Sequence, residues 1–318
     1  MSITEIIKNQ SFFKDIVEKK ENGLLSNAIL FFCEDDQTSQ NVLVLTSLML
    51  EYRIFDLFDE KSAEFQRILS GIDLDIKTYP KNKEKLLVSD SNEIVAEAYI
   101  KPVNLPFKIF VINNIDVSTD EAQNKLLKVL EEPPKNVYFL ISAKSEERVL
   151  ATIKSRCDKI KINPMTDEQI SAICQNSLAV ALGGGYVGKI LKLNAKENLR
   201  EVADFGVSLF TQLKSSKQVI KYSKQFLGYK DDLKLILQIM SLCIEDIIKF
   251  KCEGENLCKL KLYSEELKDV EPEFSIEALC EISKLITKLI EKIEFNANLT
   301  VAIDNFLLKM LEVKFLCK

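Results

Sequence analysis

The sequence of 318 residues contains no histidine and no tryptophan. Without histidine, the chain lacks the most common general base and a common metal ligand. Without tryptophan, it lacks a side chain on which nucleobases often stack. A histidine base, a histidine-bound metal and a tryptophan stacking platform are thus all excluded.

Cysteine is present but is never spaced as a metal or redox motif. No two of the eight cysteines form a Cys-x-x-Cys pair, so neither a zinc knuckle nor a redox motif is supported. We expect free, buried thiols in a reducing cytoplasm. The cysteines are Cys33, Cys157, Cys174, Cys243, Cys252, Cys258, Cys280 and Cys317.

Long apolar runs and an excess of positive charge are missing as well. No run approaches the roughly 18 residues of a membrane helix, and the first residues lack the pattern of a secretion signal. We therefore expect a cytoplasmic protein that neither spans nor binds a membrane. The chain is 47% hydrophobic and 29% charged with a net charge of −5, so any contact with DNA has to be local or made by partners. Two or three domains are expected at this length.

The most informative stretch runs from Phe107 to Ile162, where two apolar runs flank a helical segment. Residues 108–112 (KIFVI) and 137–141 (VYFLI) are short, β-branched and aromatic, as in buried strands. Between them, Ser118 and Glu121 form a capping box, and a Pro-Pro pair ends the helical pattern. The simplest packing is a right-handed β-α-β crossover in a parallel sheet.

Further strands and helices alternate on both sides of this unit, which is typical of an α/β fold. We expect strands at residues 28–33, 75–79 and 159–162, and helices at about 6–20, at about 40–52, within 54–69, and after a cap formed by Asp90 and Glu93.

Three segments resemble the AAA+ core of clamp-loader subunits. They are residues 123–134 (QNKLLKVLEEPP), 139–142 (FLIS) and 152–157 (TIKSRC), and weaker agreement extends over most of residues 1–193. The resemblance implies an α/β fold with an AAA+ (P-loop NTPase-like) parallel sheet core. A small helical lid and a C-terminal, all-helical collar domain would follow this core.

The loop after the strand at residues 28–33 stands where such a core has its P-loop. A working P-loop needs glycines whose N–H groups wrap the phosphates, a lysine that neutralises them and a hydroxyl that holds Mg²⁺. The loop contains no glycine and no lysine, and three consecutive carboxylates would repel a triphosphate. Glu34, Asp35, Asp36 and Ser39 therefore form a degenerate P-loop, and we expect no ATP binding.

A second degenerate motif follows the strand at residues 108–112. In this family an Asp-Glu pair stands there: the Asp supports Mg²⁺ and the Glu orients the attacking water. Asn113 and Asn114 carry no charge and cannot act as a base, and Asp116 comes two positions late. Two asparagines alone are an ordinary polar strand end. Together with the altered loop, they indicate that hydrolysis has been lost.

The tripeptide Ser155-Arg156-Cys157 points to a different role. The guanidinium group of arginine is a rigid, permanently charged fork that suits a phosphate, and near a domain edge it can reach a neighbouring subunit's nucleotide. The resemblance implies that Arg156 is an arginine finger supplied in trans. A salt bridge at a helix end, or a solvated side chain, is the structural alternative.

The rest of the chain differs in composition from its first half. Residues 164–201 include a glycine-rich turn and resemble a shortened AAA+ lid. From residue 202, Lys, Glu, Ile and Leu dominate, and apolar residues recur in stripes at helical spacing. We predict an AAA+ core at residues 1–163, a helical lid at 164–201 and a helical collar at 202–318 that assembles subunits.

The resemblance implies a non-hydrolysing subunit of the bacterial DNA polymerase III clamp loader, of the delta-prime type. We expect no cofactor, neither ATP nor zinc. Many such subunits carry a cysteine-rich zinc module, but this chain has no cysteine between Cys33 and Cys157. The implied partners are ATPase subunits of the tau/gamma type and a delta-type subunit, with the sliding clamp and primed DNA reached through the complex. Two alternatives stay open: an ATPase subunit of the tau/gamma type, and a degenerate AAA+ adaptor outside replication.

Overall fold

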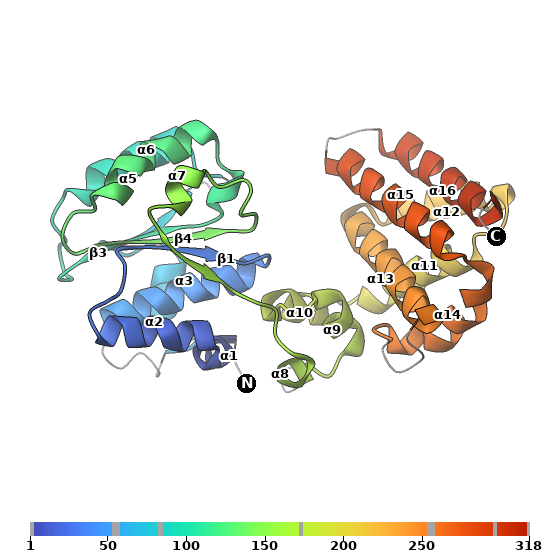
Figure 1. The fold of residues 1–318 in the computed structure, drawn as a ribbon, viewed down its shortest axis with the longest axis horizontal. Helices are drawn as coiled ribbons and strands as arrows, with labels where there is room; N and C mark the ends of the chain where they lie inside the picture. Colours follow the sequence, from blue (N-terminus) through green and yellow to red (C-terminus); the bar gives the residue numbers. More distant parts are fainter. Residues whose placement is uncertain are drawn as a thin grey trace. The chain divides into compact units, whose positions relative to one another are not determined.

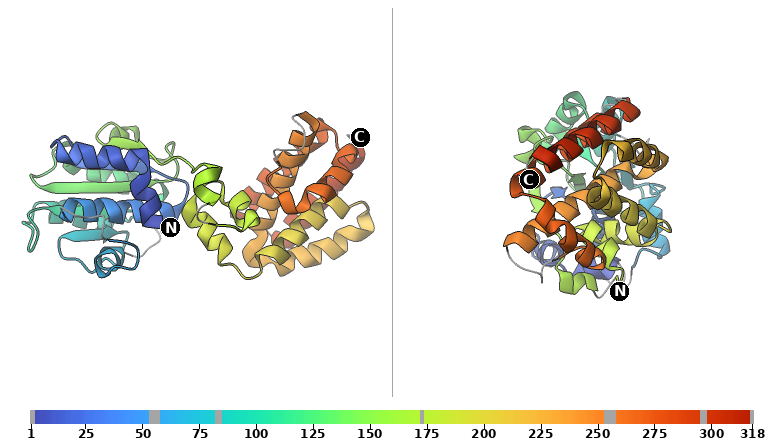
Figure 2. Two further views of the ribbon diagram at one scale, coloured as in Figure 1. Left: turned by 90° about the horizontal axis from the view of Figure 1, so that it is seen from below. Right: turned by 90° about the vertical axis from the view of Figure 1, so that its right-hand side faces the viewer.

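The computed structural model describes residues 3–52, 58–81, 85–171, 174–252, 258–294 and 298–316. The chain forms two compact units, and each is discontinuous in sequence. The first contains residues 1–173 and 185–189, and the second contains residues 174–184 and 190–318 (Figure 1, Figure 2).

A five-stranded parallel sheet forms the centre of the first unit. Its order is β2-β3-β4-β1-β5, so β1 lies between β4 and β5. The predicted strands and the parallel crossover from β3 to β4 are confirmed. The strands are β1 (Ala28–Phe32), β2 (Ile76–Tyr79), β3 (Lys108–Ile112), β4 (Val137–Ala143) and β5 (Asp158–Lys161).

Helices cover both faces of this sheet. α1, α2 and α3 lie on one face, and α5, α6 and α7 lie on the other (Figure 1). Because both faces are covered, β1 and β3 are buried along their whole length, which explains their nearly continuous apolar sequences. The helices of this unit are α1 (Ile3–Asn9), α2 (Ser11–Glu21), α3 (Asp36–Glu51), α4 (Ala63–Leu69), α5 (Val88–Ala98), α6 (Asp120–Glu131), α7 (Ala151–Lys154) and α8 (Asp167–Ser171), with a short 3-10 turn η1 (Ile115–Val117).

The predicted caps of α5 and α6 are wrong by one to three residues. For α6 the cap is Thr119 and not Ser118, since Thr119 Oγ1 accepts the backbone N–H of Ala122 at 3.3 Å. For α5 the helix begins before Asp90, whose carboxylate accepts the backbone N–H of Leu87 at 2.9 Å. The apolar pattern locates each helix, but the local hydrogen bonds decide where it begins.

The regular elements among the described residues of the second unit are all helices. The predicted apolar stripes lie on α13 and α15, where Ile236, Leu237, Met240 and Ile282 are fully buried. Residue 202, at which the composition changes, lies within α11, and the proposed domain boundaries stay predictions. The remaining helices are α9 (Ser177–Gly183), α10 (Val187–Asn194), α11 (Leu199–Gln212), α12 (Ser216–Gly228), α13 (Leu233–Cys252), α14 (Ser264–Val270), α15 (Ile276–Glu294) and α16 (Leu299–Leu316), with 3-10 turns at Lys230–Asp232, Lys261–Tyr263 and Glu271–Glu273.

Candidate functional site

The two degenerate motifs meet at the carboxyl edge of the parallel sheet. β1 leads into α3 on one face, whereas the neighbouring β4 leads into α7 on the other face (Figure 1). Neighbouring strands whose connections leave on opposite faces open a crevice at their carboxyl ends, where doubly wound folds bind ligands. A nucleotide would be expected at this edge.

The N-terminus of α3 already holds a carboxylate. Asp35 Oδ2 accepts hydrogen bonds from the backbone N–H of Thr38 at 2.7 Å and from Thr38 Oγ1 at 2.6 Å. With this cap α3 begins at Asp36, four residues before the start at about residue 40 that the apolar pattern predicts. The N–H groups and the dipole at a helix N-terminus form a natural site for a phosphate. Here the chain's own carboxylate takes that place.

The backbone of residues 185–189 lies against the same helix start. Gly188 N donates to Thr38 Oγ1 at 3.3 Å. A Cβ atom at Gly188 would come within 2.3 Å of Asp35 Oδ2, so only glycine permits this approach. The cavity that remains beside Thr38 and Tyr186 measures about 20 Å³, enough for about one water molecule. Little free volume therefore remains beside the start of α3.

Asp36 joins the two degenerate motifs. Its Oδ1 accepts Asn114 Nδ2 at 2.9 Å, and its Oδ2 accepts Lys144 Nζ at 2.7 Å. Asn114 has a φ of 50°, in the left-handed region that asparagine tolerates, and its backbone N–H donates to Ser142 Oγ at 3.0 Å. Lys144 directly follows β4 and places a cation at the loop that lacks lysine. That cation is already paired with the chain's own carboxylate.

Asn113 and Asp116 hold the strand ends. Asn113 donates to the carbonyl oxygen of Tyr79 through its backbone N at 2.9 Å and through Nδ2 at 3.2 Å, which joins β3 to β2. The carboxylate of Asp116 accepts the backbone N–H groups of Lys144 at 3.1 Å and Ser145 at 3.2 Å. Asp116 stands two positions after the place of the family's Asp-Glu pair. Its carboxylate binds the backbone of the loop after β4.

Two groups near the degenerate loop, the Cys33 thiol and the Tyr186 phenol, have raised pKa values. Burial, followed by the charges of the adjoining carboxylates, raises the pKa of the Cys33 thiol to about 12. Burial and the charge of Glu34 likewise raise the pKa of the Tyr186 phenol to about 12. Cys33 therefore stays a neutral thiol and is no nucleophile. Glu34 is exposed, whereas Ser39 is buried within α3.

Arg156 lies just beyond α7 and is held from two sides. Its Nη1 donates to the carbonyl oxygen of Thr152 at 2.9 Å, and its Nη2 donates to Glu131 Oε2 at 2.9 Å. The side chain of Glu131, at the end of α6, is 59% exposed, against 27% for Arg156. An exposed ion pair of this kind contributes about 0–1 kcal/mol. It orients the guanidinium group without locking it in place.

Ser155 and Cys157 support the turn that carries Arg156. Ser155 Oγ donates to the carbonyl oxygen of Thr152 at 3.1 Å. Cys157 belongs to the buried cluster that includes Phe139 and Ile153, and burial raises the pKa of its thiol to about 12. The tripeptide thus presents its arginine at the surface and anchors its cysteine in the core.

Alkaline pH should destabilise the fold through this buried thiol. Its pKa is about 12 in the folded chain and 9.0 without burial, so the unfolded state ionises first. The contribution to stability is therefore full below pH 9 and is lost as the pH rises toward 12. We expect the melting temperature to fall between about pH 8.5 and pH 10.5, and Cys157→Ala to reduce that fall. Calorimetry at both pH values tests this expectation, with a variant of the exposed Cys252, Cys252→Ala, as the control. The same fall in melting temperature with pH in the wild-type chain and in both variants would refute it.

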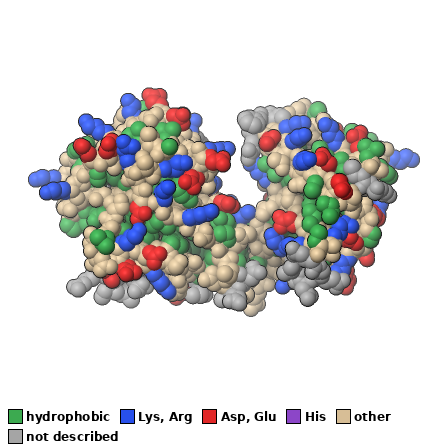
Figure 3. Space-filling model, viewed as in Figure 1, with side chains coloured by type: hydrophobic (Ala, Val, Ile, Leu, Met, Phe, Trp, Pro, Cys, Tyr) green, Lys and Arg blue, Asp and Glu red, His purple; other side chains and the backbone are tan. Residues whose placement is uncertain are grey.

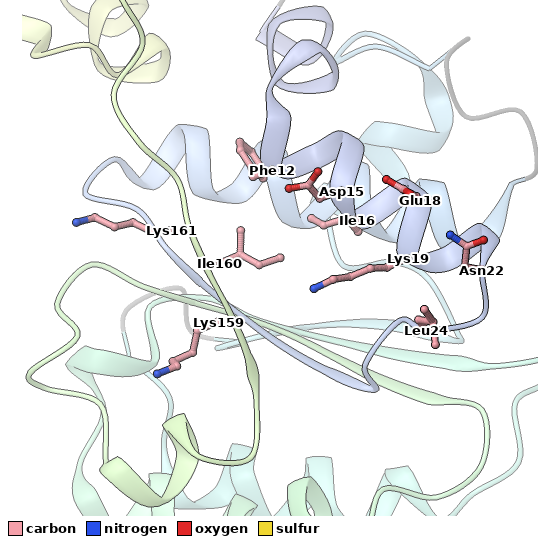
Figure 4. Close-up of a pocket in the computed structure, with 10 residues that line it drawn as sticks. All are labelled: Phe12, Asp15, Ile16, Glu18, Lys19, Asn22, Leu24, Lys159, Ile160 and Lys161. Carbon is pink, nitrogen blue, oxygen red and sulfur yellow. The ribbon is translucent and has the colours of Figure 1, made fainter.

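A larger cavity lies away from these motifs, between α2 and the edge strand β5 (Figure 4). It measures about 490 Å³, and its apolar residues include Phe12, Ile16 and Ile160. None of the residues of the degenerate motifs lines it. Size alone therefore does not identify the functional position in this molecule.

The described residues contain neither a metal-binding cluster nor a membrane-spanning helix. Nowhere in them do three or more Cys, Asp or Glu side chains come together as a metal ion would require. No helix among the same residues has the length and apolar character needed to cross a bilayer.

Comparison with known proteins identifies the family. The model described as DNA polymerase III, delta subunit, matches residues 8–166, which is half of the chain. The matched range includes both degenerate motifs and Arg156. This chain belongs to the clamp-loader family of DNA polymerase III subunits. Its parallel sheet with helices on both faces, followed by helices, is the α/β AAA+ fold that the sequence predicts.

Relatives of this clamp-loader chain are named as gamma subunits. It is 27% identical over 224 residues to DNA polymerase III subunit gamma of Buchnera aphidicola subsp. Schizaphis graminum, covering 69% of this chain and 61% of that one. It is 34% identical over 83 residues to the gamma subunit of Buchnera aphidicola subsp. Acyrthosiphon pisum, covering 26% and 23%. The chain spans less than two thirds of either relative. A crystal structure of a gamma subunit-related protein from Thermotoga maritima is similar over 95% of this chain and 98% of that one, at 20% identity and a TM-score of 0.47.

Three residues of the candidate site were not predicted from the sequence. Lys144 follows a predicted strand at the same sheet edge, and that position could have indicated it. Glu131 stands in a segment that carries the family resemblance, at the end of a predicted helix. Gly188 belongs to the predicted glycine-rich turn, but nothing in the sequence indicates its contact with Asp35, 153 residues earlier in the chain.

Proposed function

We propose that this chain is a non-hydrolysing, delta-prime-type subunit of a bacterial clamp loader. It binds no nucleotide and supplies Arg156 to the nucleotide of a neighbouring subunit. The observation that carries the proposal is the Asp35 carboxylate on the N-terminus of α3, where a phosphate would bind. A triphosphate would have to displace this carboxylate and the backbone at Gly188, and it would meet the carboxylate of Asp36 beside Lys144.

The exposure of the Arg156–Glu131 pair supports the second half of the proposal. Because the pair is partly exposed, an incoming phosphate can replace the carboxylate of Glu131 at little cost. A phosphate offers the guanidinium fork a bidentate partner and a higher charge. Arg156 would then stabilise the charge that develops during hydrolysis on the neighbouring subunit. Glu131 would hold the guanidinium group in a defined orientation before assembly.

Assembly and partners complete the proposal. The collar at residues 202–318 would join the chain to ATPase subunits of the tau/gamma type and to a delta-type subunit in the cytoplasm. On the face shown in Figure 3, Lys and Arg side chains are interspersed with Asp and Glu. That mixture favours contact with the sliding clamp and primed DNA through the complex over a DNA-binding surface on this face.

An ATPase of the tau/gamma type is the second candidate, because the curated relatives carry the name gamma. This function would require the nucleotide position beside Thr38 to open and a base to replace Asn114. The two candidates differ in one property that can be measured on the isolated chain, which is the affinity for ATP.

Calorimetric titration of the isolated chain with millimolar MgATP should give no saturable heat. The physical reason is that carboxylates occupy the place where a phosphate needs N–H groups and a lysine. A tau/gamma-type ATPase subunit in the same buffer serves as the positive control. A saturable isotherm that disappears when Asp35 and Asp36 are exchanged for other residues would favour the ATPase instead.

A further inference from the structure

β5 is an edge strand of the sheet, with β1 as its neighbour on the inner side. Ile162 N donates to the carbonyl oxygen of Phe32 at 2.9 Å. In a parallel strand every second residue directs both its N–H and its C=O to the same neighbour. Ile160 therefore also faces β1, whereas Lys159 and Lys161 direct these groups outward. Among the described residues, no hydrogen bond uses the outward groups.

The cavity of about 490 Å³ lies along this edge, with α2 as its other wall (Figure 4). Ile160 lies on the side of α2, whereas Lys159 points away from α2 (Figure 4). The apolar lining can be reached from solvent, because Leu24 is 74% exposed and both Phe12 and Ile160 are partly exposed. An extended chain laid along β5 would therefore meet backbone hydrogen-bonding groups and apolar side chains together.

The face of β5 that points away from α2 carries unpaired positive charge. Lys159 and Lys161 share this face, because side chains alternate along a strand, and both are exposed. Neither forms an ion pair among the described residues. A second copy of β5, paired antiparallel, would set lysine against lysine, which is unfavourable. A strand with acidic residues at the same positions would instead be attracted.

The face of β5 toward α2 has the opposite preference. Asp15 and Glu18 line the cavity there and are exposed, and Asp158 is paired with Lys19 at 2.7 Å. An acidic side chain on this face would be repelled, so an apolar one beside Ile160 fits best. The same carboxylates disfavour the phosphates of a nucleic acid.

We propose that the edge of β5 binds an extended segment of a partner protein as an added antiparallel strand, with acidic residues opposite Lys159 and Lys161 and an apolar residue beside Ile160. Antiparallel pairing is the more stable arrangement per residue. In it, the acidic residues exchange backbone N–H···O bonds with the two lysines, while alternate side chains provide selectivity. This binding edge is independent of the proposed role of Arg156, and it would exist whether or not the chain joins a clamp loader.

The first test follows the backbone amides of the full chain by NMR during titration with the acetylated and amidated peptide VEVEV. We expect saturable shifts at Lys159, Ile160 and Lys161 with millimolar affinity, because the edge offers only four outward backbone groups. The charge-reversed peptide VKVKV should bind at least about 5-fold more weakly, since it sets like charges opposite each other.

A second test separates strand pairing from charge attraction. In the antiparallel pairing, the N–H groups of the two glutamates face β5, whereas those of the valines face away. Methylating both glutamate nitrogens should weaken VEVEV by about 5- to 100-fold, the usual value of two hydrogen bonds. Methylating two valine nitrogens instead is the matched control and should weaken it much less.

Variants of the chain complete the test. Lys159→Glu combined with Lys161→Glu should reverse the preference from VEVEV to VKVKV. Lys125→Glu combined with Lys128→Glu makes the same change of charge at exposed positions on α6, outside the cavity, and should leave the preference unchanged. Four results would each overturn the proposal: no saturable shifts at β5 with VEVEV, equal binding of the two methylated peptides, an unreversed preference in the β5 variant, or shifts at β5 with an oligothymidylate and none with VEVEV.

Discussion

In an assembled clamp loader, Arg156→Ala should slow hydrolysis at the one neighbouring site that it serves by about 10³-fold or more, without weakening assembly. Arginine fingers contribute about 10³ to 10⁵ in kcat in well-studied phosphoryl-transfer systems. A loader with several ATP sites would lose only part of its total rate. Clamp-stimulated ATP turnover of a reconstituted loader, measured together with its size on a column, checks this expectation.

Two further variants separate the finger from a structural arginine. Arg156→Lys should restore little activity, because an ammonium group cannot form the bidentate fork. Glu131→Gln removes the ion pair but keeps the guanidinium group, so it should retain most of the turnover. If Arg156 only supports its own fold, Arg156→Ala would instead lower the melting temperature and leave turnover nearly intact. The exposed pair contributes about 0–1 kcal/mol, so a large thermal effect is not expected.

Gly188→Val should destabilise the first unit by about 1–3 kcal/mol, the usual cost of overpacking. The new Cβ would lie 2.3 Å from Asp35 Oδ2, 2.6 Å from Gln37 Cβ and 3.0 Å from Thr38 N, so the helix start would have to shift. The melting temperature, followed by circular dichroism, should fall by several degrees.

The controls for this prediction lie in the same chain. Gly228→Val adds the same side chain at a glycine with no atom within 4 Å of the new Cβ, and it should change stability much less. In an Asp35→Ala background the nearest clash is removed, so Gly188→Val should cost less than it does in the wild-type chain. Equal shifts for Gly188→Val and Gly228→Val would show that the backbone does not approach the α3 cap closely.

The strands could be predicted because both faces of the sheet are covered. Ala28–Phe32 and Lys108–Ile112 are buried at every position, and buried parallel strands have nearly continuous apolar sequences. The helix starts were predicted less well. Asp35, Thr119 and Leu87 each lie at a position that the apolar pattern does not mark, because a cap depends on a single side-chain or backbone hydrogen bond.

The altered motifs were visible in the sequence, but their contacts were not. Missing glycines and lysine indicate the loss of a phosphate site, since that chemistry depends on residue type. The pairing of Asp36 with Lys144 joins residues 108 positions apart, and the close contact of Gly188 with Asp35 depends on tertiary packing. For Arg156, the sequence indicated contact with a neighbouring subunit and offered a salt bridge as the alternative. It did not identify Glu131 as the partner in that salt bridge.

In the proposed function, this chain contributes to a neighbour's nucleotide site and has no nucleotide site of its own. The most direct measurement is the number of ATP molecules bound per reconstituted loader at equilibrium, determined by dialysis with labelled nucleotide. We expect a number equal to that of the ATPase subunits. One additional bound ATP per loader, lost when Asp35 and Asp36 of this chain are replaced, would contradict it.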